Sequence, residues 1–126
     1  MDAASLDAGS LDYLQGSLRI LCGQYGVIRP FDEIRPYRLE MSTKLAHGGH
    51  KQLYEMWTSA ITDHLNAELD AMADGDGAKF VINAASQEYA KAVRLDQLRA
   101  PVVTASFPGP VSPPRLEPWP FFSAFD

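Results

Sequence analysis

One long amphipathic segment constrains the fold of this 126-residue chain more than any other feature. Between Lys51 and about Ala73, apolar side chains recur at the spacing of one helix face. They are Leu53, Trp57, Ala60, Ile61, Leu65, Leu69 and Met72. Residues 74–77 follow, and Gly75 is suited to the left-handed conformation that ends many helices. A helix with one apolar face must bury that face against a second layer.

Two short apolar runs after this helix supply strands for such a layer. Residues 80–82 read as a buried strand, and residues 102–107 read as a second strand. Between them, Ser86 is placed to begin a short helix that runs to about Ala92. This order predicts an α/β fold, but two strands do not form a sheet that is stable alone. We therefore expect an incomplete mixed sheet flanked by helices.

The first part of the chain reads as a helix followed by irregular backbone. Ser10 and Asp12 are candidate caps for a helix that runs to about Gly23. Its apolar positions recur at helical spacing: Leu11, Leu14, Leu18, Leu21 and Cys22. Prolines at 30 and 36 then keep the preceding arginines out of the helical region. Residues 37–41 alternate polar and apolar side chains, which is typical of a short strand or extended segment.

The chain is short enough for one domain at most, and its composition divides it into three parts. Residues 1–9 are expected to be a flexible N-terminus, and residues 10–107 to form a partial α/β domain. Residues 108–126 form a proline-rich tail, with six of the nine prolines. Proline at this density cannot continue a helix or a central strand.

Charge, cysteine content and hydropathy exclude several classes of protein. The net charge of −5 argues against a surface that binds nucleic acid throughout, but residues 19–51 hold six basic and three acidic side chains. Cys22, the only cysteine, excludes an internal disulfide and a disulfide-linked partner, and indicates a buried side chain in a reducing, cytoplasmic setting. Neither a secretory signal nor a membrane-spanning run is apparent, so no membrane partner is expected.

Arg29, Arg35 and Arg38 are the first candidates for a binding surface. A guanidinium group binds phosphate or carboxylate through two parallel hydrogen bonds, and the adjacent prolines stiffen the backbone that carries these three. Lys44 and Lys51 would extend a track of phosphate contacts. The alternative is that the arginines pair with nearby carboxylates and hold their own loop together. Those carboxylates belong to Asp32, Glu33 and Glu40.

Aromatic and polar side chains near the arginines complete the candidate set. Tyr25 and Tyr37, with Tyr54, would stack on bases, or would fill the edge of a core with their hydroxyls bonded. Asn83 and Ser86 follow a strand and open a helix, where they would form an anion-binding cleft with Arg29 and Arg38, or would be an ordinary cap.

No motif with catalytic spacing is apparent, so no catalytic residue, cofactor or metal is predicted, and an enzyme is the less favoured interpretation. His47 and His50 lie three residues apart in a glycine loop, but no third ligand accompanies them nearby.

Several sequence blocks resemble the peroxide-stress YaaA family, in the same order and at similar spacing. Leu18-Arg19-Ile20-Leu21 leads into Gly23-x-Tyr25-Gly26-Val27-Ile28-Arg29-Pro30-Phe31-Asp32, and Pro36-Tyr37-Arg38-Leu39-Glu40-Met41 follows. Later blocks are Leu53-Tyr54-x-x-Trp57, Ile61-Thr62, Leu65-Asn66, Val81-Ile82-Asn83-x-Ala85-Ser86-x-Glu88-Tyr89 and Phe107-Pro108-Gly109-Pro110. Residues from about 11 to 110 thus resemble the central portion of that family.

The resemblance implies a truncated part of a single α/β domain about twice as long, in a cytoplasmic DNA-binding protein that protects against hydrogen peroxide. The family's opening Ser-Pro-Ala-Lys-type motif and closing basic helix have no counterpart here, and its helix-hairpin-helix element cannot be placed. We therefore expect a module that binds DNA without reading its sequence, through residues 19–51. The alternatives are a non-functional fragment and an uncharacterised anion-binding enzyme that uses the same cleft.

Overall fold

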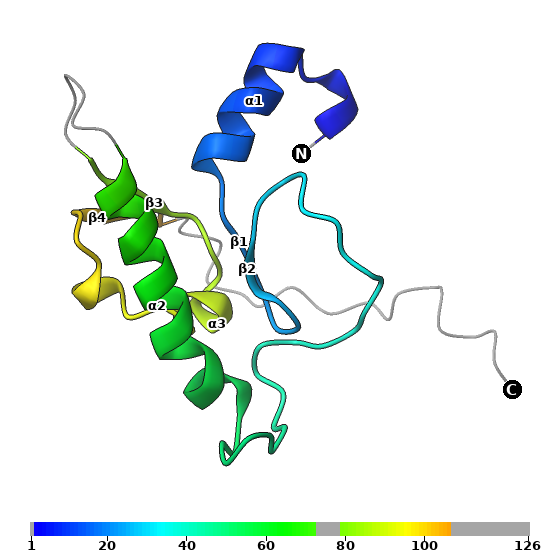
Figure 1. The fold of residues 1–126 in the computed structure, drawn as a ribbon, viewed down its shortest axis with the longest axis vertical. Coiled ribbons are helices and arrows are strands. Elements are labelled where there is room, and N and C mark those ends of the chain that lie inside the picture. The colour runs from blue at the N-terminus through cyan, green and yellow to red at the C-terminus, as the bar shows by residue number, and fades with distance from the viewer. Residues whose placement is uncertain (1, 73–78, 107–126) are drawn as a thin grey trace, which may run out of the picture.

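The computed structural model describes residues 2–72 and 79–106. Along the chain (Figure 1), its helices are η1 (Ala3–Ser5), α1 (Ala8–Ser17), α2 (Leu53–Ala71), α3 (Gln87–Ala90) and η2 (Leu95–Gln97). Its strands are β1 (Ile20–Cys22), β2 (Gly26–Ile28), β3 (Val81–Asn83) and β4 (Val102–Thr104). The predicted cap at Gly75, the end of the second strand at Phe107 and the proline-rich tail lie outside the described residues.

The strands form two separate sheets of two strands each. β1 and β2 make an antiparallel hairpin in which Leu21 pairs with Val27 and Cys22 pairs with Gly26. β3 and β4 are parallel, and Ile82 pairs with Val103. Helices and incomplete sheets are thus combined in one chain, so the predicted fold class is confirmed. None of the helices in the described ranges has the length and apolarity needed to cross a membrane.

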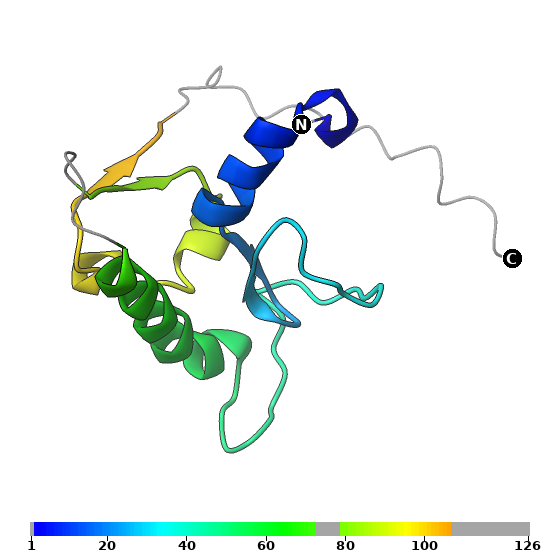
Figure 2. The same ribbon diagram turned by 45° about the horizontal axis from the view of Figure 1, so that its top comes forward.

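The predicted long helix is present as α2, and its apolar face forms the centre of the core. Leu53 and Ile61 are both 1% exposed. They pack with Met41, which precedes α2, and with Ala92 and Val93, which follow α3. Trp57 and Leu65 pack around this cluster. Sequence segments far apart in the chain therefore meet on one side of α2, as Figure 2 shows.

The predicted helix from residue 10 to Gly23 is wrong in its second half. α1 ends at Ser17, and Leu21 and Cys22 belong to β1. The Arg19 guanidinium donates hydrogen bonds to the carbonyl oxygens of Gln15 and Leu18 at the end of α1, at 3.3 and 2.8 Å. A cation at this position satisfies carbonyls that lack helical partners. The N-cap is Asp7, whose carboxylate accepts from the Ser10 backbone, rather than Ser10 or Asp12.

The structure decides between two alternatives at one predicted segment and differs from the prediction at another. Residues 37–41, predicted as a short strand or an extended segment, form no strand, and Met41 is completely buried in the core. The strand at residues 80–82 begins one residue later, and its side chains are not buried: Phe80 is 58% and Ile82 is 65% exposed. An apolar run predicts a buried strand, but one face of this sheet has no covering layer within the described residues.

Trp57 joins the hairpin to α2 through contacts that require two glycines. The indole nitrogen of Trp57 donates a 2.8 Å hydrogen bond to the Gly23 carbonyl oxygen. Gly26 has a φ of +76°, and a Cβ atom there would lie 2.8 Å from the Trp57 ring. A Cβ on Gly23 would lie 2.5 Å from the Leu39 carbonyl oxygen. At Gly23 and Gly26 the hairpin therefore approaches the later loop and α2 more closely than a residue with a side chain would allow.

Two buried polar side chains of α2 fix the segment between α3 and β4. The Thr62 hydroxyl accepts from the Arg94 backbone at 3.0 Å. The Asn66 amide donates to the Gln97 carbonyl oxygen at 3.0 Å and accepts from the Arg99 backbone at 2.7 Å. Because buried backbone groups need partners, these bonds determine how residues 94–99 lie against α2.

We expect Gly26→Ala to lower the free energy of unfolding by about 2–4 kcal/mol, because it combines a left-handed φ with a clash against Trp57. Gly48→Ala is the matched control, since Gly48 has a φ of +59° and open space around it. The control should cost about 1 kcal/mol in urea denaturation. Equal losses in the two variants would show that the contact with Trp57 is not close.

Candidate nucleic-acid interface

The candidate arginines lie in the connection after β2, residues 29–41, which we call the arginine loop. Two tyrosines hold this loop against the hairpin. The rings of Tyr25, in the hairpin turn, and Tyr37, in the loop, meet edge to face with centroids 5.6 Å apart. The Tyr25 hydroxyl also accepts a 3.2 Å hydrogen bond from the Arg35 backbone. The loop is irregular, yet its backbone is fixed to a regular element.

Tyr37 also contacts the core through Cys22. Hydrogen bonding with Cys22, together with burial of the hydroxyl, raises the pKa of Tyr37 to about 12. The Tyr37 hydroxyl is therefore neutral at physiological pH. Cys22 itself is 5% exposed, which confirms the prediction of a buried free cysteine.

Arg29 is paired within the loop. Its guanidinium donates to the Asp32 carboxylate at 2.9 and 3.1 Å, and its backbone N–H donates to the same carboxylate at 2.8 Å. These hydrogen bonds hold the pKa of Asp32 below its usual value and raise that of Arg29. This arrangement is the predicted alternative, in which a local carboxylate neutralises the arginine. Arg29 thus closes a turn in the structure as it stands.

Arg35 and Arg38 are different, because both side chains are exposed and neither forms an ion pair with any described residue. Lys44 and Lys51 are also exposed further along the same connection. Glu33 and Glu40 are exposed acidic neighbours in the arginine loop. Two free guanidinium groups on a fixed backbone are suited to bind an oxyanion.

The candidate tyrosines have bonded hydroxyls, and two of the three have partly exposed rings. Tyr25 is 37% exposed and Tyr37 is 38% exposed. Tyr54 is half-buried, and its hydroxyl donates to the Glu88 carbonyl oxygen at 3.0 Å. Bonded hydroxyls are what the structural alternative predicted. The edge-to-face contact between Tyr25 and Tyr37 occupies part of the ring surface that a base would need.

Asn83 and Ser86 form local hydrogen bonds after β3. The Asn83 side chain donates to the Thr104 hydroxyl and accepts from the Ala85 backbone. The Ser86 hydroxyl accepts from the Tyr89 backbone at 3.5 Å, as a cap does. His47 and His50 pair through their backbones, and no group of three metal-ligating side chains occurs within residues 2–72 and 79–106.

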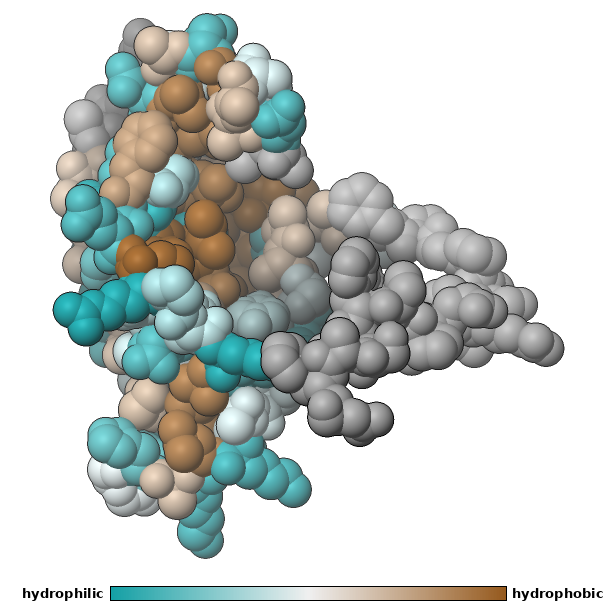
Figure 3. Space-filling view, turned by 90° about the vertical axis from the view of Figure 1, so that its right-hand side faces the viewer, coloured by the Kyte–Doolittle hydropathy of each residue, from teal (hydrophilic) through white to brown (hydrophobic). Residues whose placement is uncertain are grey.

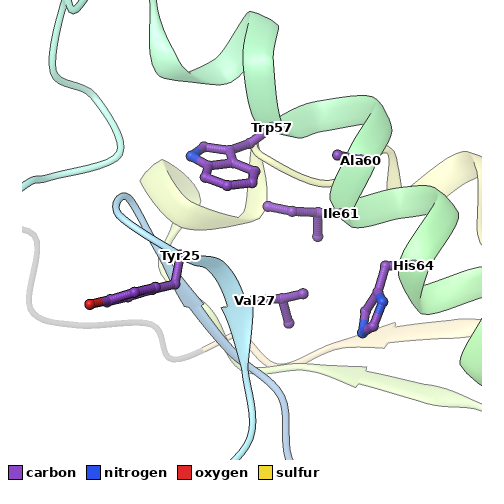
Figure 4. A pocket seen from close by; sticks show the side chains of 6 residues that line it. All are labelled: Tyr25, Val27, Trp57, Ala60, Ile61 and His64. Carbon is purple, nitrogen blue, oxygen red and sulfur yellow. The ribbon is translucent and has the colours of Figure 1, made fainter. Parts of the chain in front are cut away.

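Of the cavities on the described surface, two stand out, and neither is lined by the predicted arginines, Asn83 or Ser86. One, of about 220 Å³, lies between β2 and α2, and Figure 4 shows Val27, Trp57, Ile61 and His64 around it. Tyr25 is at its edge, with its hydroxyl directed away. The other, of about 270 Å³, is lined mainly by Leu39, Leu45, Leu53 and Met56. Both linings are largely apolar, which does not suit a phosphate.

Sequence reasoning missed one electrostatic contact near this surface. The Arg19 guanidinium binds the Glu68 carboxylate through two hydrogen bonds of 2.7 and 2.9 Å, and so connects the start of β1 to α2. Both side chains are less than a third exposed. Hydrogen bonding from Arg19 lowers the pKa of Glu68. No local pattern marks this pair, because 49 residues separate its members.

Comparison with known proteins identifies the family. The protein-family model described as "Peroxide stress protein YaaA" matches residues 1–110 of the chain. The chain belongs to the peroxide stress protein YaaA family. The matched range includes every described helix and strand, together with the whole arginine loop.

The curated relatives of this YaaA-family chain are named UPF0246 proteins. One from Aliivibrio fischeri (strain MJ11) is 45% identical over 107 residues, and one from Delftia acidovorans is 49% identical over 109 residues. A relative from Neisseria meningitidis serogroup B is 48% identical over 107 residues. Each match covers 85% of this chain and 40% of the relative. The chain therefore spans well under half the length of these relatives, as a match to a central portion predicts.

We expect Arg19→Met to destabilise the protein by about 1 kcal/mol at neutral pH, with a smaller loss in acid. The pKa of Glu68 is depressed in the folded state, so its contribution is present above the ordinary value of 4.5 and is lost as pH falls through the folded pKa. Urea denaturation from neutral pH to about pH 3 measures this. Arg94→Met is the control, because Arg94 has no ion pair among the described residues. If the difference in unfolding free energy between Arg19→Met and Arg94→Met stayed constant across pH, the pairing of Arg19 with Glu68 would be contradicted.

Proposed function

We propose that this chain acts in the cytoplasmic response to hydrogen peroxide and contacts DNA phosphates through Arg35 and Arg38. Membership of the peroxide stress family supports the first part. The observation that carries the second is the pair of exposed guanidinium groups on a loop fixed by Tyr25 and Tyr37. Contacts of this kind position a protein on DNA without reading its sequence.

A fixed loop favours binding because less freedom is lost when the ligand arrives. The Arg35 backbone is already bonded to Tyr25, and Tyr37 directly precedes Arg38 in the chain. Lys44 and Lys51 extend the positive charge along the connection to α2. Arg29 has a supporting role in this proposal, because its bonds to Asp32 hold the start of the loop.

The alternative function, an anion-binding enzyme that uses a cleft of Arg29, Arg38, Asn83 and Ser86, has weaker support. Asn83 and Ser86 use their polar atoms on neighbouring residues, and the two apolar cavities include neither them nor an arginine. Phosphate contact on the open surface needs no cavity, so the arginine loop is suited to a polyanion more than to a small molecule.

We expect the protein to bind duplex DNA at low salt, with an affinity that falls steeply as salt rises. Arg35→Ala combined with Arg38→Ala should weaken binding at least tenfold and reduce the slope of log affinity against log salt by about 2. Fluorescence anisotropy across a salt series measures both. Lys91→Ala combined with Arg94→Ala is the control, because it removes the same charge from exposed positions outside the loop.

A substitution that should strengthen binding and a survival measurement in bacteria extend this test. Glu40→Gln should strengthen binding, because it removes a negative charge two residues from Arg38. In bacteria that lack their own family member, the chain should improve survival in hydrogen peroxide, and the double arginine variant should not. Equal loss of binding in the loop variant and the Lys91/Arg94 control would contradict the assignment to this loop. No binding at low salt would favour the non-functional fragment.

A further inference from the structure

The parallel sheet of β3 and β4 lies outside the main core. The buried cluster around Met41, Leu53 and Ile61, with the apolar side chains packed on it, includes no residue of either strand among the described residues. Each strand has one neighbour, so each has an outer edge with no described strand beside it. Two parallel strands of three residues are far below what a self-supporting sheet requires.

One face of this sheet carries a row of exposed apolar side chains. Side chains alternate between the two faces of a strand, so Phe80 and Ile82 point the same way. Ile82 pairs with Val103 in the parallel register, which places Val103 on that face as well. The three side chains are 58%, 65% and 57% exposed, respectively. Val81 and Val102, on the opposite face, are half-buried. Figure 2 shows α2 on one side of the two strands.

A bare apolar face is unusual for a sheet of this type. Parallel sheets in proteins are covered on both faces, and their strands are apolar on both sides for that reason. Exposed apolar patches on a protein mark surfaces that another element covers. Apolar side chains are also exposed elsewhere among the described residues, including Tyr13, Phe31 and Met72. Figure 3 shows apolar surface in a hollow on one face of the molecule. The β3–β4 face differs from these in that its strands are parallel, and a parallel sheet is normally covered on both faces.

The length of the relatives indicates what covers this face. The match accounts for 40% of the relatives from Aliivibrio fischeri and Delftia acidovorans, so 60% of each lies outside it. The matched 40% contains both strands, but within the described residues it supplies no cover for this face and no third strand.

We infer that Phe80, Ile82 and Val103 form a docking surface for polypeptide corresponding to the unmatched segments of the YaaA-family relatives. The occupant adds at least one strand to an edge of the β3–β4 sheet and lays an apolar element over the three side chains. Backbone hydrogen bonds along the edge give affinity, and the apolar row sets the register.

The test supplies these segments as a second polypeptide. The full 126-residue chain, carrying a tag, is produced together with all segments of the Aliivibrio fischeri relative outside the matched 107 residues. We expect co-purification as one complex, with its mass measured by light scattering. Amide hydrogen exchange at residues 80–83 and 102–104 should be at least tenfold slower in the complex than in the chain alone.

Single substitutions distinguish specific binding at this surface from non-specific hydrophobic association. Ile82→Asp and Val103→Asp should each reduce the yield of complex at least tenfold. Ile82→Asp should leave the unfolding midpoint of the isolated chain unchanged, because that side chain is 65% exposed. Tyr13→Asp is the matched control, since Tyr13 is 73% exposed on α1, and it should leave the complex intact.

Three results would overturn the inference. The first is that no complex forms, and the second is that the complex tolerates both aspartate substitutions. The third is that the chain alone forms a dimer that Ile82→Asp dissociates, because the occupant would then be a second copy of the chain.

Discussion

The contact between Trp57 and the hairpin turn determines how the rest of the structure is arranged. The indole donates to the Gly23 carbonyl oxygen and packs where Gly26 has no side chain, and these two contacts fix the hairpin turn against α2. Tyr25 follows from this placement, because it lies in the same turn. Tyr25 then holds Tyr37 and the Arg35 backbone. The position of the exposed arginines thus depends on Trp57 through the contacts of the hairpin turn.

The sequence predicted the elements whose signals are local. α2 was recognised from its apolar spacing, and Ser86 caps α3 as its position indicated. The hairpin was missed because Leu18, Leu21 and Cys22 also have helical spacing, which competes with the local pairing of Leu21 with Val27. The Arg19–Glu68 pair was missed for a different reason, because 49 residues separate its members. Burial of residues 80–82 was wrong because an apolar run reports what a strand can cover, not whether a cover is present.

The candidate site was predictable in its residues but not in their roles. The arginines were recognised by type and by their prolines, yet only the structure separates Arg29, bonded to Asp32, from Arg35 and Arg38. The tyrosines were expected either to stack on bases or to bond through their hydroxyls. Tyr25 and Tyr54 use their hydroxyls on backbone groups, so they hold structure, and the candidate chemistry lies with the guanidinium groups.

The most direct test of whether the hairpin turn holds the arginine loop in place is amide hydrogen exchange at Arg35. The exchange is followed by NMR in the wild type and in Tyr25→Phe. We expect exchange in the wild type to be at least tenfold slower than in an unstructured chain, because the Tyr25 hydroxyl accepts from this amide. Tyr25→Phe should remove that protection and leave the Trp57 indole protected by Gly23. Unprotected Arg35 in the wild type would contradict a loop held in place by the hairpin.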